Sequence, residues 1–231
     1  MKAIILAAGF GKRLRPLTNT VPKCLVPIKG RVLLDIWIDR LQQAKVGPFL
    51  VNTHYLAEQV QKHLANSWYS SDVILTHEEH LLGTAGTLIA NAAFFDGEDA
   101  MLIHADNYCM ADLSEFVRQH SSRPKECEIT MMAFRADTPA QCGILELDAR
   151  GLVVGFHEKV ANPPGNLANG AVYLLSGRAM AEICEELPSA IDFSTEVIPH
   201  FLNRIYTYET DQTFIDIGSP ETYGKACERH A

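Results

Sequence analysis

The first thirty residues place glycines and cations directly after a short apolar stretch. Ala3 to Ala7 is apolar and predicts a buried strand, and the turn that follows contains Gly9 and Gly11. Lys12 and Arg13 lie in the same turn. Glycine lets the backbone approach a phosphate closely, and positive charge at the carboxyl end of a strand favours an anion. These residues therefore predict a phosphate-binding loop.

Two common phosphate-binding motifs do not fit this loop. A Gly-x-x-x-x-Gly-Lys-Ser/Thr motif is excluded because the chain has no Gly-Lys-Ser or Gly-Lys-Thr. A dinucleotide-binding motif needs a third glycine and a helix that starts at once, whereas Arg13 and Pro16 follow here. A dinucleotide-dependent oxidoreductase is thereby disfavoured, and an assay for nicotinamide turnover tests that alternative.

A carboxylate ends another apolar stretch of the chain. Asp106 directly follows Ala100 to Ala105, which predicts a strand. At the carboxyl end of a central strand, an aspartate is well placed to hold a divalent cation against phosphate oxygens. Asp106 is therefore a candidate metal ligand; the alternative is that it caps a helix starting near Leu113.

Strands and helices alternate through the part of the chain that positions these residues. We predict strands at 3–7, 49–52, 73–76 and 100–105, and helices at 32–44, 56–64 and from the loop at 77–88 to about 93. This alternation implies parallel crossovers, and hence an α/β fold with a doubly wound, mostly parallel sheet. Farther along we predict a strand at 128–134, a hairpin from 141–148 and 151–157, and helices at 177–185, at 193–202 and from Ser219-Pro220. No linker or repeat interrupts 1–231, so we expect one domain.

The composition argues against several classes of protein. A net charge of −8 disfavours a nucleic-acid partner. The six cysteines include no Cys-x-x-Cys pair, which indicates reduced packing residues in a cytoplasmic protein rather than zinc ligands or disulfides. No apolar run approaches the roughly 20 residues of a membrane helix, so we expect a soluble, unprocessed chain without a membrane partner. A monomer and a homodimer both fit the sequence.

The order of motifs along the chain resembles the sugar-phosphate nucleotidyltransferase family. The family signature matches Leu6-Ala-Ala-Gly-Phe-Gly-Lys-Arg-Leu-Arg-Pro-Leu-Thr18, and Pro22-Lys-Cys-Leu25 follows it. A recurring end motif of the family matches Asp216-Ile-Gly-Ser-Pro-Glu-Thr-Tyr223. The resemblance covers Lys2 to Tyr223 and is strongest to the mannose-1-phosphate and heptose-1-phosphate guanylyltransferases.

The resemblance implies which residues form the site. Ala105 precedes Asp106, where the family more often has glycine. Asp106 and Asp216 are expected to hold Mg²⁺, and Arg13, Lys23 and Asp106 are expected to be the catalytic residues. The resemblance assigns nucleotide binding to Leu6, Ala7, Ala8, Gly9, Gly11, Lys12, Arg13, Lys23, Glu78, Glu79, Gly83, Thr84 and Ala85. It assigns sugar-phosphate binding to Asn107, Gly143, Glu158, Lys159, Asn169 and Gly170.

The resemblance also implies a reaction. A nucleoside monophosphate passes from a nucleoside triphosphate to a mannose- or heptose-type sugar 1-phosphate, which gives a nucleoside-diphosphate sugar and pyrophosphate. GTP is favoured because a carboxylate at Glu78 or Glu79 suits the two adjacent donors of guanine, whereas uracil offers one; solvated surface glutamates are the alternative. Residues 1–110 are then mainly the nucleotide-binding half and residues 111–231 mainly the sugar-phosphate-binding half. A uridylyl- or cytidylyltransferase, and a catalytically silent nucleotide-sugar sensor, remain open.

His77 and His80 flank two glutamates and raise the alternative of a metal site. The metalloprotease pattern needs histidines four residues apart, and these are three apart. We therefore expect solvated loop residues here rather than metal ligands.

Overall fold

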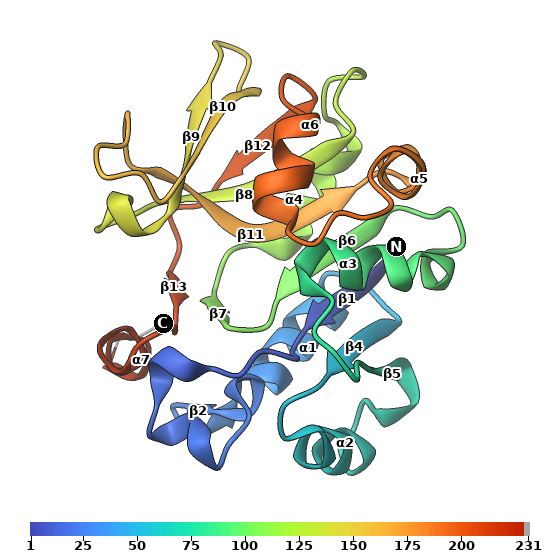
Figure 1. The fold of residues 1–231 in the computed structure, drawn as a ribbon, viewed down its shortest axis with the longest axis vertical. Helices are drawn as coiled ribbons and strands as arrows, with labels where there is room; N and C mark the ends of the chain where they lie inside the picture. The colour runs from blue at the N-terminus through green and yellow to red at the C-terminus, as the bar shows by residue number, and fades with distance from the viewer. Residues whose placement is uncertain (229–231) are drawn as a thin grey trace. The chain divides into compact units, whose positions relative to one another are not determined.

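The computed structural model describes residues 1–228, which form two compact units (Figure 1). The glycine-loop unit contains Lys2–Leu81, Ile103–Leu113 and residues 212–228. The hairpin unit contains Met1, Leu82–Leu102 and Ser114–Asp211. Each unit is therefore assembled from segments that are far apart in the sequence.

The glycine-loop unit contains three parallel strands in the order β1-β4-β5: β1 (Lys2–Leu6), β4 (Phe49–Thr53) and β5 (Val73–His77). Helix α1 (Leu33–Gln43) lies between β1 and β4 in the chain, and α2 (Ala57–Ala65) lies between β4 and β5. Parallel neighbours need such crossover helices. Strand β4 is buried along its whole length, which explains why its residues form a continuous apolar run rather than an alternating one.

Short elements complete the glycine-loop unit. Strands β2 (Pro27–Ile28) and β3 (Arg31–Val32) form a small hairpin, and β7 (Asn107–Cys109) pairs antiparallel with β13 (Phe214–Asp216). Helix α7 (Pro220–Glu228) follows β13. Strands β2, β3 and β7 were not predicted, because strands of two or three residues have no readable periodicity.

The hairpin unit contains strands in the order β10-β9-β11-β8-β12. They are β8 (Ile129–Arg135), β9 (Gly143–Leu147), β10 (Val153–Glu158), β11 (Leu167–Leu175) and β12 (Ile205–Glu209). The pairs are antiparallel except β8 with β12, which is parallel. The predicted hairpin is confirmed as β9 and β10, and Gly151 has a φ of +80° in the turn between them.

The helices of the hairpin unit are α3 (Gly83–Ala90), α4 (Leu113–Ser121), α5 (Gly177–Glu186) and α6 (Ile198–His200). The predicted helix at 193–202 is present over residues 193–200, but it is not a regular α-helix. A π-helical turn at Phe193–Val197 precedes the short α6, which contains Pro199. Proline has no N–H to donate within a helix, so a regular ladder of hydrogen bonds cannot continue through this position.

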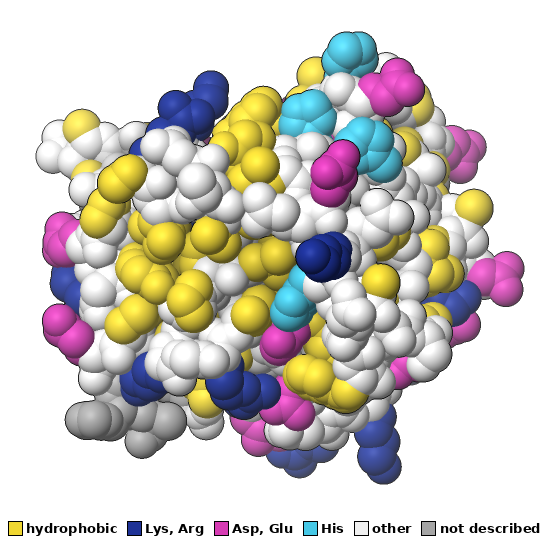
Figure 2. All heavy atoms as spheres, turned by 90° about the horizontal axis from the view of Figure 1, so that it is seen from below, with side chains coloured by type: hydrophobic (Ala, Val, Ile, Leu, Met, Phe, Trp, Pro, Cys, Tyr) yellow, Lys and Arg dark blue, Asp and Glu magenta, His cyan; other side chains and the backbone are white. Residues whose placement is uncertain are grey.

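The predicted fold class, α/β with a mostly parallel central sheet, is confirmed. Strand β6 (Ala100–His104) contributes its first three residues to the hairpin unit and its last two to the glycine-loop unit. All six cysteines are free thiols. Within residues 1–228, no helix has the length and hydrophobicity needed to cross a bilayer. Figure 2 shows one face of the molecule, where basic and acidic side chains are interspersed and hydrophobic side chains gather over one part.

Candidate functional site

The turn after β1 has a conformation that requires glycine at position 11. Gly11 has a φ of +60°, and a Cβ there would lie 2.9 Å from the Thr18 Cγ2 atom. The Thr18 hydroxyl donates a hydrogen bond of 2.7 Å to the Gly11 carbonyl. Gly9, by contrast, has open space where a Cβ would be. The conformation of the loop is thus fixed at Gly11, and the backbone at Gly9 is unobstructed. A ligand can therefore approach the backbone closely at Gly9.

The loop cation Arg13 lies next to the end of β13. Its Nη2 atom is 3.4 Å from the Asp216 Oδ2 atom, and 70% of its side chain is exposed. A Cβ on Gly218 would lie 2.6 to 2.9 Å from three atoms of the Arg13 guanidinium. Glycine at position 218 therefore leaves the space that Arg13 occupies.

Lys23 contacts both aspartates that the sequence analysis selected as metal ligands. Its Nζ atom lies 2.6 Å from the Asp106 Oδ2 atom and 3.6 Å from the Asp216 Oδ1 atom. Only 10% of the lysine side chain is exposed, whereas the two aspartate side chains are 37% and 48% exposed. One buried ammonium group therefore contacts a pair of accessible carboxylates and offsets part of their negative charge.

Backbone hydrogen bonds hold the two aspartates near the glycine loop. The Asp106 carbonyl accepts from the Ile217 N–H at 3.1 Å, and the Ala105 N–H donates to the Leu6 carbonyl at 3.1 Å. Within the β7–β13 pair, Asp216 stands opposite Asn107. These bonds join the end of β1, the chain just after β6 and the end of β13 at one place.

Asp106 is ionised in this arrangement. Burial raises the pKa of its carboxyl group, but the charges of Lys23 and His104 and a hydrogen bond from Lys23 outweigh burial. The net result is a pKa below the ordinary value for aspartate. Asp106 therefore offers a carboxylate rather than a carboxylic acid to a cation.

The donor set fits Mg²⁺. This ion prefers oxygen ligands and is commonly held by one or two carboxylates, with waters and substrate phosphates completing its coordination. Asp106 and Asp216 supply two carboxylates that are each more than a third exposed. The ion would share these carboxylates with the Lys23 ammonium.

Asn52 is a positioning residue that the sequence analysis missed. Its Oδ1 atom accepts from the Ala7 N–H at 2.7 Å, and its Nδ2 atom donates to Glu78 Oε1 at 2.8 Å. Glu78 is only 4% exposed, whereas Glu79 is exposed. Asn52 thus connects the start of the glycine loop to Glu78. A polar residue at the end of the apolar stretch 49–51 was the available signal.

The loop residues Gly83, Thr84 and Ala85 pack against the chain near Ile191. Gly83 has a φ of +79°, and a Cβ there would overlap the Ile191 carbonyl oxygen. The Ala85 N–H donates to the same carbonyl at 2.9 Å, and the Thr84 hydroxyl accepts from the Phe193 N–H at 2.7 Å. Small residues are therefore needed at the start of α3.

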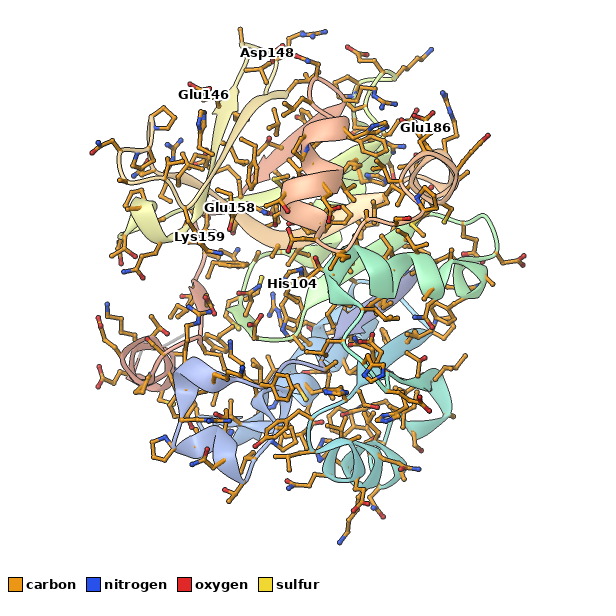
Figure 3. All side chains as sticks on the ribbon, viewed as in Figure 1. His104, Glu146, Asp148, Glu158, Lys159 and Glu186 are labelled. Atoms are coloured by element: carbon orange, nitrogen blue, oxygen red, sulfur yellow. The ribbon has the colours of Figure 1, made fainter. Side chains whose placement is uncertain are left out.

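Three residues predicted to bind the sugar phosphate lie together in the hairpin unit. Gly143 and Glu158 stand opposite each other in the β9–β10 pair. The Lys159 Nζ atom is 2.6 Å from the Glu158 Oε1 atom, and the two side chains are labelled in Figure 3. A Cβ on Gly143 would lie 2.5 Å from the Phe156 ring and 2.6 Å from the Glu158 Oε2 atom. Glycine at position 143 therefore makes room for both side chains.

Asn169 and Gly170 lie at an irregularity of β11. The register of β11 against β8 shifts between Asn169 and Tyr173, and Ala171 has a φ of +52°. The Asn169 amide donates to the Tyr173 hydroxyl at 2.7 Å, and its oxygen accepts from the Ala171 N–H at 2.9 Å. Bulges of this kind often reorient side chains beside active sites. The remaining sugar candidate, Asn107, is 5% exposed and belongs to the glycine-loop unit.

Glu182, Glu186 and His200 form a separate cluster whose ligand atoms lie within 4.8 Å of one another. Arg204 donates to both oxygens of Glu182, at 2.8 and 2.5 Å, and the His200 Nε2 atom is 2.8 Å from the same carboxylate. These contacts lower the pKa of Glu182 to about 2. Because an arginine already neutralises Glu182, we interpret the cluster as an ion-pair network.

A family model described as nucleotidyl transferase matches residues 2–231. The chain belongs to this nucleotidyl transferase family. A relative from Aneurinibacillus thermoaerophilus, named D-glycero-alpha-D-manno-heptose 1-phosphate guanylyltransferase, is 28% identical over 98% of this chain and 96% of its own length. A relative from Candida glabrata, named mannose-1-phosphate guanyltransferase 2, is 29% identical over 96% of this chain and 63% of its own length.

The chain thus spans about three fifths of the length of several relatives in the nucleotidyl transferase family, with 61% and 63% of two of them covered. Among solved structures, HddC from Yersinia pseudotuberculosis is 27% identical, with a TM-score of 0.82 and coverage of 98% of both chains. A second structure of HddC, complexed with GMP-PN, has a TM-score of 0.81 at 26% identity. The family and its fold therefore extend over nearly the whole chain.

Proposed function

We propose that the chain transfers a nucleoside monophosphate from a nucleoside triphosphate, with GTP favoured, to a mannose- or heptose-type sugar 1-phosphate. The products are a nucleoside-diphosphate sugar and pyrophosphate. The observation that carries this proposal is the contact of one buried lysine, Lys23, with both Asp106 and Asp216 beside the glycine loop. The names of the relatives support the choice of guanine and of the two sugar classes.

In this proposal, the glycine-loop unit binds the triphosphate. Arg13 and the amides of the loop hold the β- and γ-phosphates, because an exposed guanidinium and backbone N–H groups suit phosphate oxygens. Asn52 holds the Ala7 amide in place and thereby fixes where the loop begins. Asp106 and Asp216 would hold Mg²⁺, which would supply positive charge that stabilises the phosphates.

The hairpin unit supplies the residues proposed for the sugar phosphate. Glu158 accepts hydrogen bonds from sugar hydroxyls, and Lys159 pairs with the phosphate of the sugar. Without substrate, Lys159 forms an ion pair of 2.6 Å with Glu158. The charge of the lysine is therefore partly compensated before the sugar phosphate binds. Asn169 and Gly170 lie beneath the sugar ring in this proposal.

The reaction is a displacement at the α-phosphorus of the triphosphate. An oxygen of the sugar phosphate forms a bond to the α-phosphorus, and the bond from that phosphorus to the bridging oxygen breaks. Pyrophosphate leaves with the electron pair. The attacking phosphate is already ionised near neutral pH, so no general base is needed. The protein contributes positioning and neutralisation of charge, in which Lys23 reduces the repulsion between the two anions.

Glu79 is our preferred residue for recognition of guanine. Glu78 is buried and accepts from Asn52, whereas Glu79 is exposed. A carboxylate can accept from the two neighbouring donors of guanine at once. Substitution of Glu79 by glutamine should reduce the preference for GTP over UTP without loss of the transfer itself.

Pyrophosphate release tests the proposal. Each of four nucleoside triphosphates is combined with Mg²⁺ and a panel of hexose, hexosamine and heptose 1-phosphates. Release with GTP and a mannose- or heptose-type 1-phosphate is the expected result. Release with UTP or CTP instead would reassign the base. Triphosphate binding without release from any pair would contradict the transferase proposal and favour a silent sensor.

A further inference from the structure

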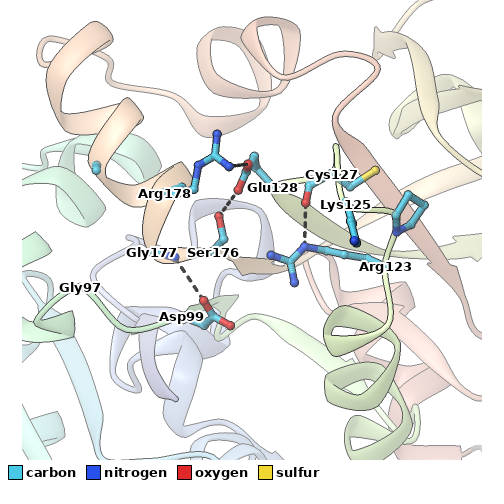
Figure 4. A pocket seen from close by; sticks show the side chains of 11 residues that line it. Gly97, Asp99, Arg123, Lys125, Cys127, Glu128, Ser176, Gly177 and Arg178 are labelled. Atoms are coloured by element: carbon cyan, nitrogen blue, oxygen red, sulfur yellow. Dashed lines mark hydrogen bonds and ion pairs between the residues drawn. The ribbon is translucent and has the colours of Figure 1, made fainter.

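A pocket in the hairpin unit is lined by none of the residues assigned above (Figure 4). It lies between the segment 123–128 and the start of α5, and its volume is about 630 Å³. Small-molecule sites usually measure roughly 300 to 1,000 Å³. The pocket is therefore large enough for a ligand the size of a nucleotide.

The two carboxylates of the pocket already have partners in the protein. Glu128 is 6% exposed and accepts a hydrogen bond from the Ser176 hydroxyl. Asp99 accepts from the Gly177 N–H at 3.2 Å, at the beginning of α5. These bonds, drawn as dashed lines in Figure 4, hold the acidic groups against the backbone and the hydroxyl that surround them.

The positive charges of the pocket are less fully balanced by protein partners than its two carboxylates are. Arg123 is held by two backbone carbonyls, with Nε 2.8 Å from the Cys127 oxygen and Nη1 2.6 Å from the His120 oxygen. Neither Arg123 nor the exposed Lys125 forms an ion pair with a carboxylate within residues 1–228. Arg178 is 85% exposed and lies 3.4 Å from Glu128.

We propose that this pocket binds a small anion that carries a phosphate or diphosphate group. Arg123 has a fixed guanidinium with donors that its two carbonyl partners do not use, and Lys125 and Arg178 add exposed charges. A planar guanidinium with neighbouring cationic groups is the donor set that phosphate oxygens favour. This local excess of positive charge contrasts with the net charge of −8 of the whole chain.

Calorimetric titration with inorganic pyrophosphate, without divalent metal, tests the pocket. The titrations use Arg13→Ala protein, in which the proposed triphosphate site is weakened, and compare it with the same protein carrying Lys125→Gln and Arg178→Gln. We expect the dissociation constant to rise at least tenfold in the triple variant. Arg135→Gln is the matched control, because Arg135 is an exposed arginine paired with Glu209 and does not line the pocket.

Orthophosphate, mannose 1-phosphate and GDP are then titrated in the same way. Binding of any of them that depends on Lys125 and Arg178 supports the pocket and distinguishes a monoester ligand from a diphosphate ligand. Equal binding by the triple variant and its parent, or no binding by the parent at millimolar concentration, would overturn the proposal. Circular dichroism verifies that each variant is folded. An inactive wild-type enzyme would contradict the proposed transferase function but would leave this test intact.

Discussion

The Lys23 ammonium bridges Asp106 and Asp216, at 2.6 Å from one carboxylate and 3.6 Å from the other. The same carboxylates are the proposed ligands of Mg²⁺. Lysine and metal therefore compete for the same oxygens when no substrate is bound. A triphosphate would relieve this competition, because it offers Lys23 another anion to contact.

Substitution Lys23→Gln should have opposite effects on metal binding and turnover. Without the competing ammonium, the affinity of the free protein for Mg²⁺ should rise about tenfold, a change worth about 1.4 kcal/mol. Turnover should fall by about 100-fold, because the two substrate anions lose a neutralising charge. Calorimetry measures the first effect and pyrophosphate release the second.

Arg31→Gln is the control for Lys23→Gln, since it removes a cation from an exposed ion pair with Asp39. Arg31→Gln should change neither the affinity for Mg²⁺ nor the turnover. Weaker Mg²⁺ binding by Lys23→Gln would show that lysine and metal do not compete for these carboxylates.

Asp106→Asn should reduce turnover by about 100-fold or more, because the amide retains the shape but not the charge that a cation needs. The thermal midpoint of unfolding should fall, because the buried Lys23 ammonium loses its partner at 2.6 Å, but the variant should still be folded. Pyrophosphate release and circular dichroism measure the two effects. Near-normal turnover of the folded variant would remove Asp106 from the metal site.

Gly218→Ala should displace Arg13 without disturbing the fold. The added Cβ would lie 2.6 to 2.9 Å from the guanidinium, whose side chain is exposed and can move aside. We expect the KM for the triphosphate to rise by about tenfold, as it should in Arg13→Ala. Gly165→Ala is the control, because no atom lies within 4 Å of its added Cβ. An unchanged KM in both Arg13→Ala and Gly218→Ala would exclude Arg13 from phosphate binding.

Gly143→Ala should affect the other substrate. Its Cβ would press on the Phe156 ring and on the Glu158 carboxylate, at 2.5 and 2.6 Å. The KM for the sugar 1-phosphate should therefore rise several-fold more than the KM for the triphosphate. Steady-state kinetics with each substrate varied in turn measures both constants. Equal changes in the two KM values would instead indicate a general loss of structure.

Stability should decrease as the pH falls from 6.5 to 3 because of His120. Burial, followed by the charge of Arg123, lowers the pKa of this histidine from 6.5 to about 3. In that range the unfolded chain binds a proton that the folded chain does not, so acid favours unfolding. The contribution is present above pH 6.5 and is lost progressively below it, by about 5 kcal/mol in total once the pH is below 3.

Urea unfolding at a series of pH values measures this dependence. His120→Asn should flatten it, even if the variant is less stable overall, because asparagine does not titrate. His80→Asn, in an exposed position, should leave the slope unchanged. If the free energy of unfolding of His120→Asn depends on pH as steeply as that of the wild type, the acid sensitivity comes from other groups.

Local sequence patterns predicted much of the fold and the residues of the site. The apolar stretches that became β1 and β4 are continuous because these strands are buried, whereas the apolar residues of β5 are partly exposed. The spacing of the three parallel strands requires crossovers. The pairing of β7 with β13 could not be predicted, since three residues near position 108 meet three near position 215. The link from Ala7 through Asn52 to Glu78 likewise depends on the packing of segments that are distant in sequence.

The β7–β13 pair also has a consequence for the order of events during synthesis. A ribosome completes β1, the glycine loop, Lys23 and Asp106 long before it reaches Asp216. Until residues 214–216 emerge, strand β7 lacks its partner and Lys23 has only one of its two carboxylates. The complete site therefore forms only after residues 214–216 have been synthesised, so a nascent chain released before that point should carry the loop without a complete pair of acidic residues.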